Sequence, residues 1–190
     1  MGAAVRAGGP TLGGMTTPQF VLDLREKVGH MPLWIPGCTA VVVRSALVDP
    51  DTGARPPVGL PCAPDSVEVL VVRRADNAQW TPVTGIVDPG EEPATAAVRE
   101  TLEEAGVVAH ARRLLSVEVV GPVTYENGDV TRYVDTAFLL EWMEGEPYAA
   151  DGENTDARFV RADRLPTMNP RFTRTVERGL SGEAEAAFRP

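Results

Sequence analysis

One short acidic stretch, flanked by residues typical of a helix start and a helix end, restricts the possible fold of this chain more than any other feature. Residues 85–107 read GIVDPGEEPATAAVRETLEEAGV and contain six acidic residues against a single basic one, Arg99. Pro93 is typical of the first turn of a helix, and Gly106 of the residue that follows one, so we expect a helix over Ala94–Ala105. The acidic charge of the chain is therefore concentrated on and around one helix.

The predicted helix has two unlike faces. At about 100° per residue, one face carries apolar side chains and the opposite face carries the carboxylates of Glu100, Glu103 and Glu104. The apolar face consists of Ala94, Val98, Leu102 and Ala105. Like charges three or four residues apart repel by roughly 0.2–0.5 kcal/mol per pair, and a divalent cation removes that repulsion. This face predicts a site for metal and phosphate together, with an ordinary solvated acidic face as the alternative.

Composition restricts the function classes that remain. The chain has 190 residues, of which 43% are hydrophobic and 24% charged, as expected for a single globular domain. Its 18 basic and 27 acidic residues give a net charge of −9, which excludes general nucleic-acid binding because that needs a basic surface. No apolar run approaches the roughly 20 residues needed to span a bilayer, so we expect no membrane insertion. An anionic ligand must therefore arrive with a cation.

The chain divides into a leader, one domain and a tail. Residues 1–14 contain five glycines and no continuous apolar core, which predicts a flexible leader rather than a signal peptide. We expect one domain over residues 15–181 and a polar tail over 182–190. Residues 49–66 contain five prolines and are expected to form a long surface loop. Cys38 and Cys62 match no zinc-binding spacing and could form at most one disulfide. We expect both to be free thiols, as is usual for proteins of the reducing cytoplasm.

Valine-rich segments that are typical of strands lie before and after the predicted acidic helix, and this order predicts a fold of the α/β class. An Asn127-Gly128 turn predicts that the strands on either side of it pair antiparallel. Thr17 followed by Pro18 is typical of a helix start, and the apolar face of that first helix is a candidate contact in a homodimer or within its own domain. The expected strands are Thr39–Ser45, Val67–Arg74, Arg112–Val120, Arg132–Trp142 and Ala157–Val160, with a closing helix over Phe172–Leu180.

The residues around the acidic helix resemble the signature of the Nudix hydrolases. The pattern G-x5-E-x7-R-E-x2-E-E-x-G is matched at Gly85, Glu91, Arg99, Glu100, Glu103, Glu104 and Gly106. Seven fixed positions would recur by chance in a chain of this length on the order of once in a million. The resemblance spans about residues 39–165 and implies an α/β/α sandwich with a mixed sheet. One position departs from the pattern, because Thr101 stands where an aliphatic residue is usual.

The resemblance implies roles for the motif residues. Glu100 and Glu104 would be the principal ligands of Mg²⁺, or of Mn²⁺ as an alternative, and Glu103 a ligand directly or through water. Glu91 would pair with Arg99 and fix the loop against the helix, an orienting role that an ion pair can fill. The alternative for Arg99 is a simple ion pair with Glu103, four residues further along the helix.

The resemblance also implies a reaction, in which water attacks the phosphorus of a nucleoside diphosphate linked to a second group X. Metal is required because an acidic site repels a diphosphate. Glu153 matches the place of the acidic loop that supplies a general base in the members that cleave ADP-ribose, with a plain surface turn as the alternative. Glu103 is the reserve candidate for the base.

The sequence narrows the substrate only to a small nucleotide. Pro122 is similar to a marker of ADP-ribose pyrophosphatases, whereas Tyr125 is close to a marker of dinucleoside polyphosphate hydrolases. ADP-ribose or another nucleotide sugar is favoured; nucleoside triphosphates and dinucleoside polyphosphates are alternatives, as is a non-catalytic nucleotide-binding regulatory module. Arg74, Trp80 and Gly85 are the expected substrate-binding residues, Arg74 for phosphate and Trp80 for stacking on a base.

Overall fold

The central strand of the fold is β3 (Leu33–Ser45), whose residues from Cys38 onward are buried. It runs parallel to β8 (Val130–Glu144) and antiparallel to β4 (Val67–Arg74). The middle of β3, residues Gly37–Ala40, also pairs antiparallel with β6 (Val83–Ile86). The structure is a computed structural model that describes residues 11–12, 15–125 and 127–188.

Three further strands complete a mixed sheet of seven. β5 (Trp80–Thr81) and β9 (Asn154–Arg161) both pair antiparallel with β4. β7 (Val108–Thr124) pairs antiparallel with β8 and forms one end of the strand order β5-β4-β3-β8-β7. The turn between β7 and β8 contains Asn127 and Gly128, which confirms the predicted antiparallel hairpin.

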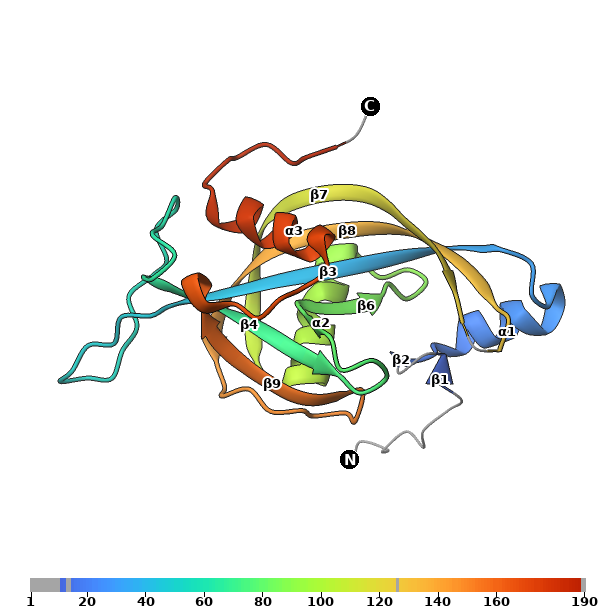
Figure 1. Cartoon of the computed structure of the whole chain (residues 1–190), viewed down its shortest axis with the longest axis horizontal. Helices are drawn as coiled ribbons and strands as arrows, with labels where there is room; N and C mark the ends of the chain where they lie inside the picture. The colour runs from blue at the N-terminus through green and yellow to red at the C-terminus, as the bar shows by residue number, and fades with distance from the viewer. Residues whose placement is uncertain (1–10, 13–14, 126, 189–190) are drawn as a thin grey trace.

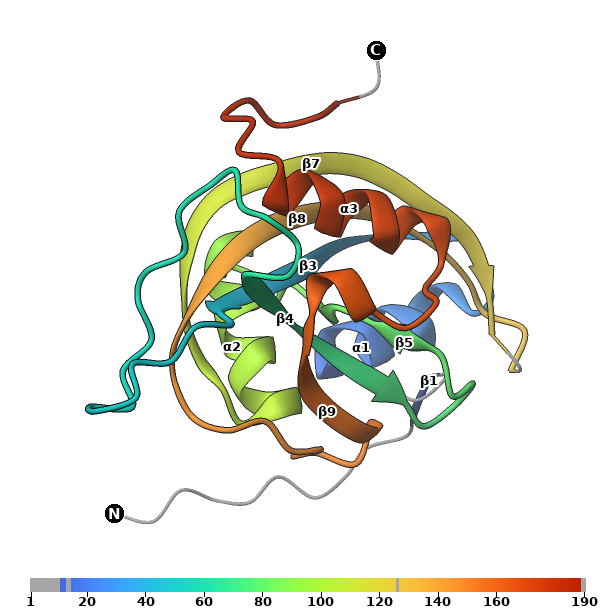
Figure 2. The ribbon, with the colours of Figure 1, turned by 60° about the vertical axis from the view of Figure 1, so that its left-hand side comes forward.

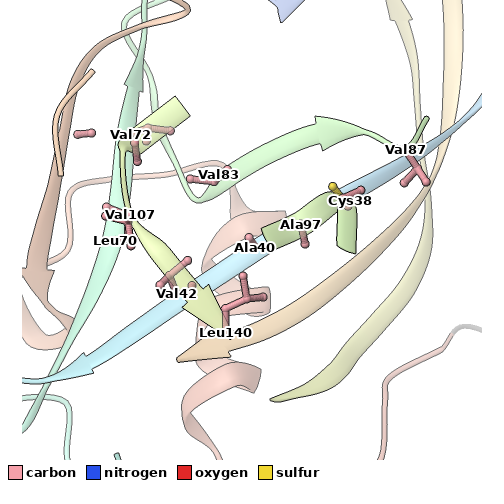
Figure 3. Packing of buried hydrophobic residues seen from close by; sticks show 14 residues of the cluster. Cys38, Ala40, Val42, Leu70, Val72, Val83, Val87, Ala97, Val107 and Leu140 are labelled. Atoms are coloured by element: carbon pink, nitrogen blue, oxygen red, sulfur yellow. The ribbon is translucent and has the colours of Figure 1, made fainter. Parts of the chain in front are cut away.

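Two helices cover opposite faces of the sheet (Figure 1). α2 (Pro93–Ala105) packs on the face to which Cys38, Ala40 and Val42 of β3 point, and these side chains form a buried cluster with residues of α2 (Figure 3). α3 (Pro170–Leu180) packs on the other face, against the alternate residues Val41 and Val43. Figure 2 shows α3 lying across β7 and β8. The layers confirm the predicted α/β/α sandwich.

The first helix, α1 (Gln19–Val28), lies at the start of β3. Its Phe20 and Val21 pack against Ile35 and Ile86, so part of its apolar face is covered within its own domain. The helix begins after Pro18, which occupies the N-cap position, so Thr17 is one residue farther out than predicted.

The segments outside the sandwich are mostly irregular. Residues 46–66 connect β3 to β4 as the predicted long loop, which extends away from the sheet in Figure 2. The short 3₁₀ helix η1 (Ala162–Arg164) follows β9, and Ala187 exchanges backbone hydrogen bonds with Leu115 and Val117 of β7. Of the predicted leader, residues 1–14, the structure describes only β1 (Thr11–Leu12), which pairs with β2 (Met15–Thr16) at the start of the predicted domain. None of the described helices is long and apolar enough to cross a membrane.

Candidate active site

The acidic helix is oriented differently from the prediction. Leu102, placed by helical spacing on the buried side, is 51% exposed, whereas Glu104 is only 4% exposed. The residues that face the sheet are small. Thr101 is fully buried, and its hydroxyl is satisfied because it donates to the carbonyl of Ala97. The predicted split into an apolar face opposite an acidic one is therefore wrong. Small side chains let the helix lie close to the sheet, and this brings two of the acids inward.

Glu104 is held at the junction of α2 and β9. Its Oε2 accepts a hydrogen bond of 2.8 Å from the side-chain amide of Asn154, and its backbone carbonyl accepts from the amide of Ala150. Burial raises the pKa of Glu104 well above its usual range, and the bond from Asn154 opposes that rise. A carboxylate in this position lacks solvent to stabilise its charge, so a cation would be favoured beside it.

Glu100 lies against the backbone of Gly85 in β6. A Cβ atom on Gly85 would lie 2.2 Å from both Cγ and Cδ of Glu100, so only glycine leaves room for this carboxylate. In the structure Gly85 admits the Glu100 side chain, and its predicted role in binding substrate stays a prediction. Burial raises the pKa of Glu100 to about 7, against the opposing effect of Arg99.

Arg99 joins the loop ahead of the helix to the acids on it. Its Nε and Nη2 donate to the two carboxylate oxygens of Glu91 at 3.0 and 2.9 Å. Its Nη1 donates to Glu100 and to the more exposed Glu103, each at 2.9 Å, and Nη2 also reaches the carbonyl of Ile86 at 3.1 Å. The pairing expected with Glu91 and the alternative pairing with Glu103 are thus both present. The hydrogen bonds from Arg99 lower the pKa of Glu91.

Two residues from other segments lie near these acids. Glu153 precedes β9, and its carbonyl accepts a hydrogen bond of 2.9 Å from the amide of Ala75, which follows β4. Its negative charge contributes to the raised pKa values of Glu100 and Glu104. Arg74, paired with Asp76 at 2.9 Å, is close enough to interact electrostatically with Glu104 and Glu153. The structure thus brings Glu153 and Arg74 close to Glu104, while the roles expected of them stay predictions.

A cleft of about 830 Å³ is lined by Arg74, which interacts with Glu104, and by Gly85, against which Glu100 lies; the acids themselves are not among its lining residues. The predicted stacking residue Trp80 is not among its lining residues, and Arg158 covers the Trp80 ring at 4.4 Å from its centre. The Trp80 ring packs against Arg158, and its substrate-binding role stays a prediction. Four other residues that line the cleft were not predicted from the sequence: Thr81, Asp135, Arg171 and Phe172. No short motif links them, because they come from β5, β8 and the start of α3.

The donor set fits a hard divalent cation. Glu100 and Glu104 provide carboxylate oxygens, the ligands that Mg²⁺ prefers, and burial raises the pKa of both, with Arg99 compensating only Glu100. Across the described ranges, no three acidic, histidine or cysteine side chains converge closely enough to hold a metal ion. Glu100 and Glu103 accept hydrogen bonds from Arg99 in this structure. To bind a cation, these two carboxylates would have to give up the bonds from Arg99.

Comparison with known proteins points to one family. The family model described as the NUDIX domain matches residues 54–179. The RNA pyrophosphohydrolase of Pseudomonas savastanoi pv. phaseolicola is 37% identical over 70 residues, which are 37% of this chain and 43% of that protein. The NAD-capped RNA hydrolase NudC of Escherichia coli is 30% identical over 125 residues, 66% of this chain and 45% of that protein. The chain thus spans less than half the length of these curated relatives.

Solved structures share the same fold. A crystal structure of a UDP-X diphosphatase matches with a TM-score of 0.51 at 17% identity, covering 85% of this chain and 68% of that one. An ADP-ribose pyrophosphatase from Streptococcus suis matches with a TM-score of 0.51 at 15% identity, covering 77% of this chain and 89% of that one. At such low identity the similarity extends to the fold alone.

Proposed function

Because this chain belongs to the NUDIX domain family, we propose that it is a pyrophosphohydrolase that cleaves a nucleoside diphosphate linked to a second group X. One observation carries the proposal: the buried carboxylate of Glu104 and the partly buried one of Glu100 lie next to Arg74 and Gly85, respectively, and both of these residues line a cleft large enough for a nucleotide. Clefts of a few hundred to about 1,000 Å³ are typical of small-molecule sites.

The acids of α2 would hold the metal. Glu100 and Glu104 are proposed as the principal ligands and Glu103 as a ligand directly or through water, with Mg²⁺ as the ion and Mn²⁺ as an alternative. A bound divalent cation would screen the diphosphate and make water more acidic. Arg74 would contact a phosphate, because it lines the cleft and lies near the acids.

Arg99 is proposed to position these acids rather than to touch substrate. Replacing it by lysine, Arg99→Lys, is expected to lower kcat about tenfold and to raise the Mg²⁺ concentration needed for half activity. Lysine keeps the charge but lacks the planar fork that bonds Glu91, Glu100 and Glu103 at once. A magnesium titration of the initial rate measures both effects. Wild-type kinetics in this variant would contradict the positioning role.

Glu153 is proposed as the general base that takes a proton from the attacking water. Glu153→Gln is expected to lower kcat about a hundredfold and to remove the ascending limb of the pH–rate profile, because the amide cannot accept that proton. The control is Glu103→Gln, which tests the reserve base and is expected to keep the ascending limb. Loss of the limb in Glu103→Gln instead would assign the base to Glu103.

ADP-ribose or another nucleotide sugar is the proposed substrate. Such a molecule has a single diphosphate, which suits one group of acids with a bound cation. A chain with a net charge of −9 is poorly suited to the many phosphates of RNA, although the two curated relatives are named as enzymes acting on RNA. The buried Cys38 thiol accords with a proposed cytoplasmic location, and a homodimer through α1 stays a prediction.

The test is a hydrolysis screen with product identification in Mg²⁺ and in Mn²⁺. It covers ADP-ribose, NADH, UDP-sugars, dinucleoside polyphosphates, nucleoside triphosphates and a 5′-triphosphorylated RNA oligomer. We expect ADP-ribose or a nucleotide sugar to give a nucleoside monophosphate and the phosphorylated X group. Preferred release of pyrophosphate from a triphosphate would replace the proposal by the alternative enzyme. Binding without hydrolysis of any compound would make the chain a regulatory module.

A further inference from the structure

Asn154 carries a buried amide at the start of β9, outside the acidic motif of residues 85–106. The residue is 5% exposed, and its Nδ2 donates to Oε2 of Glu104 at 2.8 Å. A polar group taken out of water costs free energy unless it is hydrogen-bonded, and bonds to a charged acceptor are among the stronger ones. The buried amide is therefore matched to the carboxylate of Glu104.

An irregular pairing of β9 with β4 turns Asn154 towards α2. The register shifts between Arg73 and Arg74, so that Thr155 is an extra residue in the ladder. Asn154 and Ala157 are three residues apart, and a regular strand would direct them to opposite faces of the sheet. The bulge lets both face α2, where Ala157 belongs to the buried cluster. Bulges re-aim side chains in this way, and they are common beside active sites.

The segment between β8 and β9 also holds the main chain of Glu104. The last carbonyl groups of a helix have no partner within it. Here the carbonyl of Glu104 accepts from the amide of Ala150, and that of Ala105 accepts from the amide of Tyr148, each at 3.1 Å. The main chain and the side chain of Glu104 are thus both bonded to one continuous stretch, which ends at Asn154.

Only one of the two carboxylate oxygens of Glu104 is held in this way. Among the described residues, none donates a hydrogen bond to its Oε1, and this oxygen is not one of the fully buried atoms that lack a partner. The negative charges of Glu100, Asp151 and Glu153 repel the Glu104 carboxylate. Without the bond from Asn154, this repulsion would favour other rotamers of Glu104. Ordering the side chain again would then cost part of the free energy of binding a ligand.

We propose that Asn154 is a positioning residue of the metal site: by holding Oε2 of Glu104, it keeps Oε1 ordered and free to bind a divalent cation. This inference rests on the proposed function, in which Glu104 is a metal ligand. Asn154 acts on the ion only through Glu104, so its loss is expected to weaken metal binding rather than abolish it. Removing a group that hydrogen-bonds a metal ligand typically lowers metal affinity or activity by about 10- to 100-fold.

The test is a titration of the metal-free, full-length protein with Mn²⁺, followed by the electron paramagnetic resonance signal of the free ion. Asn154→Leu has a side chain of similar size that cannot donate, and it is expected to raise the Kd for Mn²⁺ about tenfold. Circular dichroism establishes that each variant is folded at the temperature of the titration, so that the Kd describes folded protein. Asn154→Ala removes the amide without adding bulk and takes the place of Asn154→Leu if the latter does not fold. An unchanged Kd in the folded variant would overturn the inference.

Thr155→Val is the matched control, because Thr155 lies in the same bulge and its hydroxyl donates to the carbonyl of Arg73, at 3.3 Å, rather than to a carboxylate. This control is expected to keep the Kd for Mn²⁺ within about twofold of wild type. An equal loss of affinity in Thr155→Val would assign the effect to the bulge and overturn the role of the amide. No binding of Mn²⁺ by the wild type would overturn the proposed metal site and this inference with it. Weaker binding by Asn154→Leu, in a protein that hydrolyses nothing in the screen, would overturn the proposed function and leave this inference standing.

Discussion

Replacing Glu104 by glutamine, Glu104→Gln, is expected to lower kcat in Mg²⁺ by about a thousandfold or more. The amide is nearly the same shape but has no charge to hold a cation. The fold is expected to persist, because the side-chain oxygen of glutamine can still accept the hydrogen bond from Asn154. Burial already disfavours the charged form of Glu104, so we expect a melting temperature equal to or above that of the wild type.

The measurement combines initial rates over a range of Mg²⁺ concentrations with thermal unfolding in the absence of metal. Glu92→Gln is the matched control, since Glu92 is exposed and lies just before the same helix. This control is expected to keep wild-type rates. A Glu104→Gln variant with full turnover would rule out the proposed metal assignment.

The second large effect is expected for Gly85→Ala. The added Cβ atom would overlap Cγ and Cδ of Glu100, so the carboxylate has to leave its place over β6. We expect kcat to fall about a thousandfold, because a displaced ligand misplaces both the metal and the substrate. Overpacking of this buried position is expected to lower the free energy of unfolding by about 1–3 kcal/mol.

Gly59→Ala provides the control for Gly85→Ala. A Cβ atom on Gly59 would contact nothing within 4 Å, and its backbone is not in the left-handed region, so this variant is expected to behave as wild type. The two variants are compared by kcat, by half-activating Mg²⁺ concentration and by denaturant unfolding. Near-normal turnover of Gly85→Ala would show that the position of Glu100 is not needed for the reaction.

Local sequence patterns predicted the regular elements well. β4 occupies the predicted Val67–Arg74, and α2 begins one residue before its predicted start and ends where Gly106 was expected to end it. Gly106 adopts a positive φ of 66°, which explains why a glycine marks this boundary. In contrast, β5 and β6 are two and four residues long, too short to show a strand period. They were missed although they pair next to the central strands.

The candidate site was predictable only as far as the motif extends. The spacing of the acids indicated a metal site, and the resemblance to the Nudix hydrolases implied that Glu153 lies close to it. The orientation of α2 was not predictable from hydrophobicity, because small residues rather than Leu102 face the sheet. The cleft was missed since its residues come from segments that meet only through the sheet topology, as Asp135 and Arg171 do.

The hydrogen bonds of Arg99 have a consequence for how metal enters. Its guanidinium neutralises part of the charge of Glu91, Glu100 and Glu103 before any cation arrives, so the apo protein carries an internal counter-ion. If Glu100 and Glu103 bind the metal as proposed, loading the site would substitute one cation for another at oxygens that Arg99 now holds. Breaking the bonds from Arg99 costs free energy, and this cost would weaken the binding of the metal. We therefore expect a weakly bound, readily exchanged ion rather than a permanently bound one.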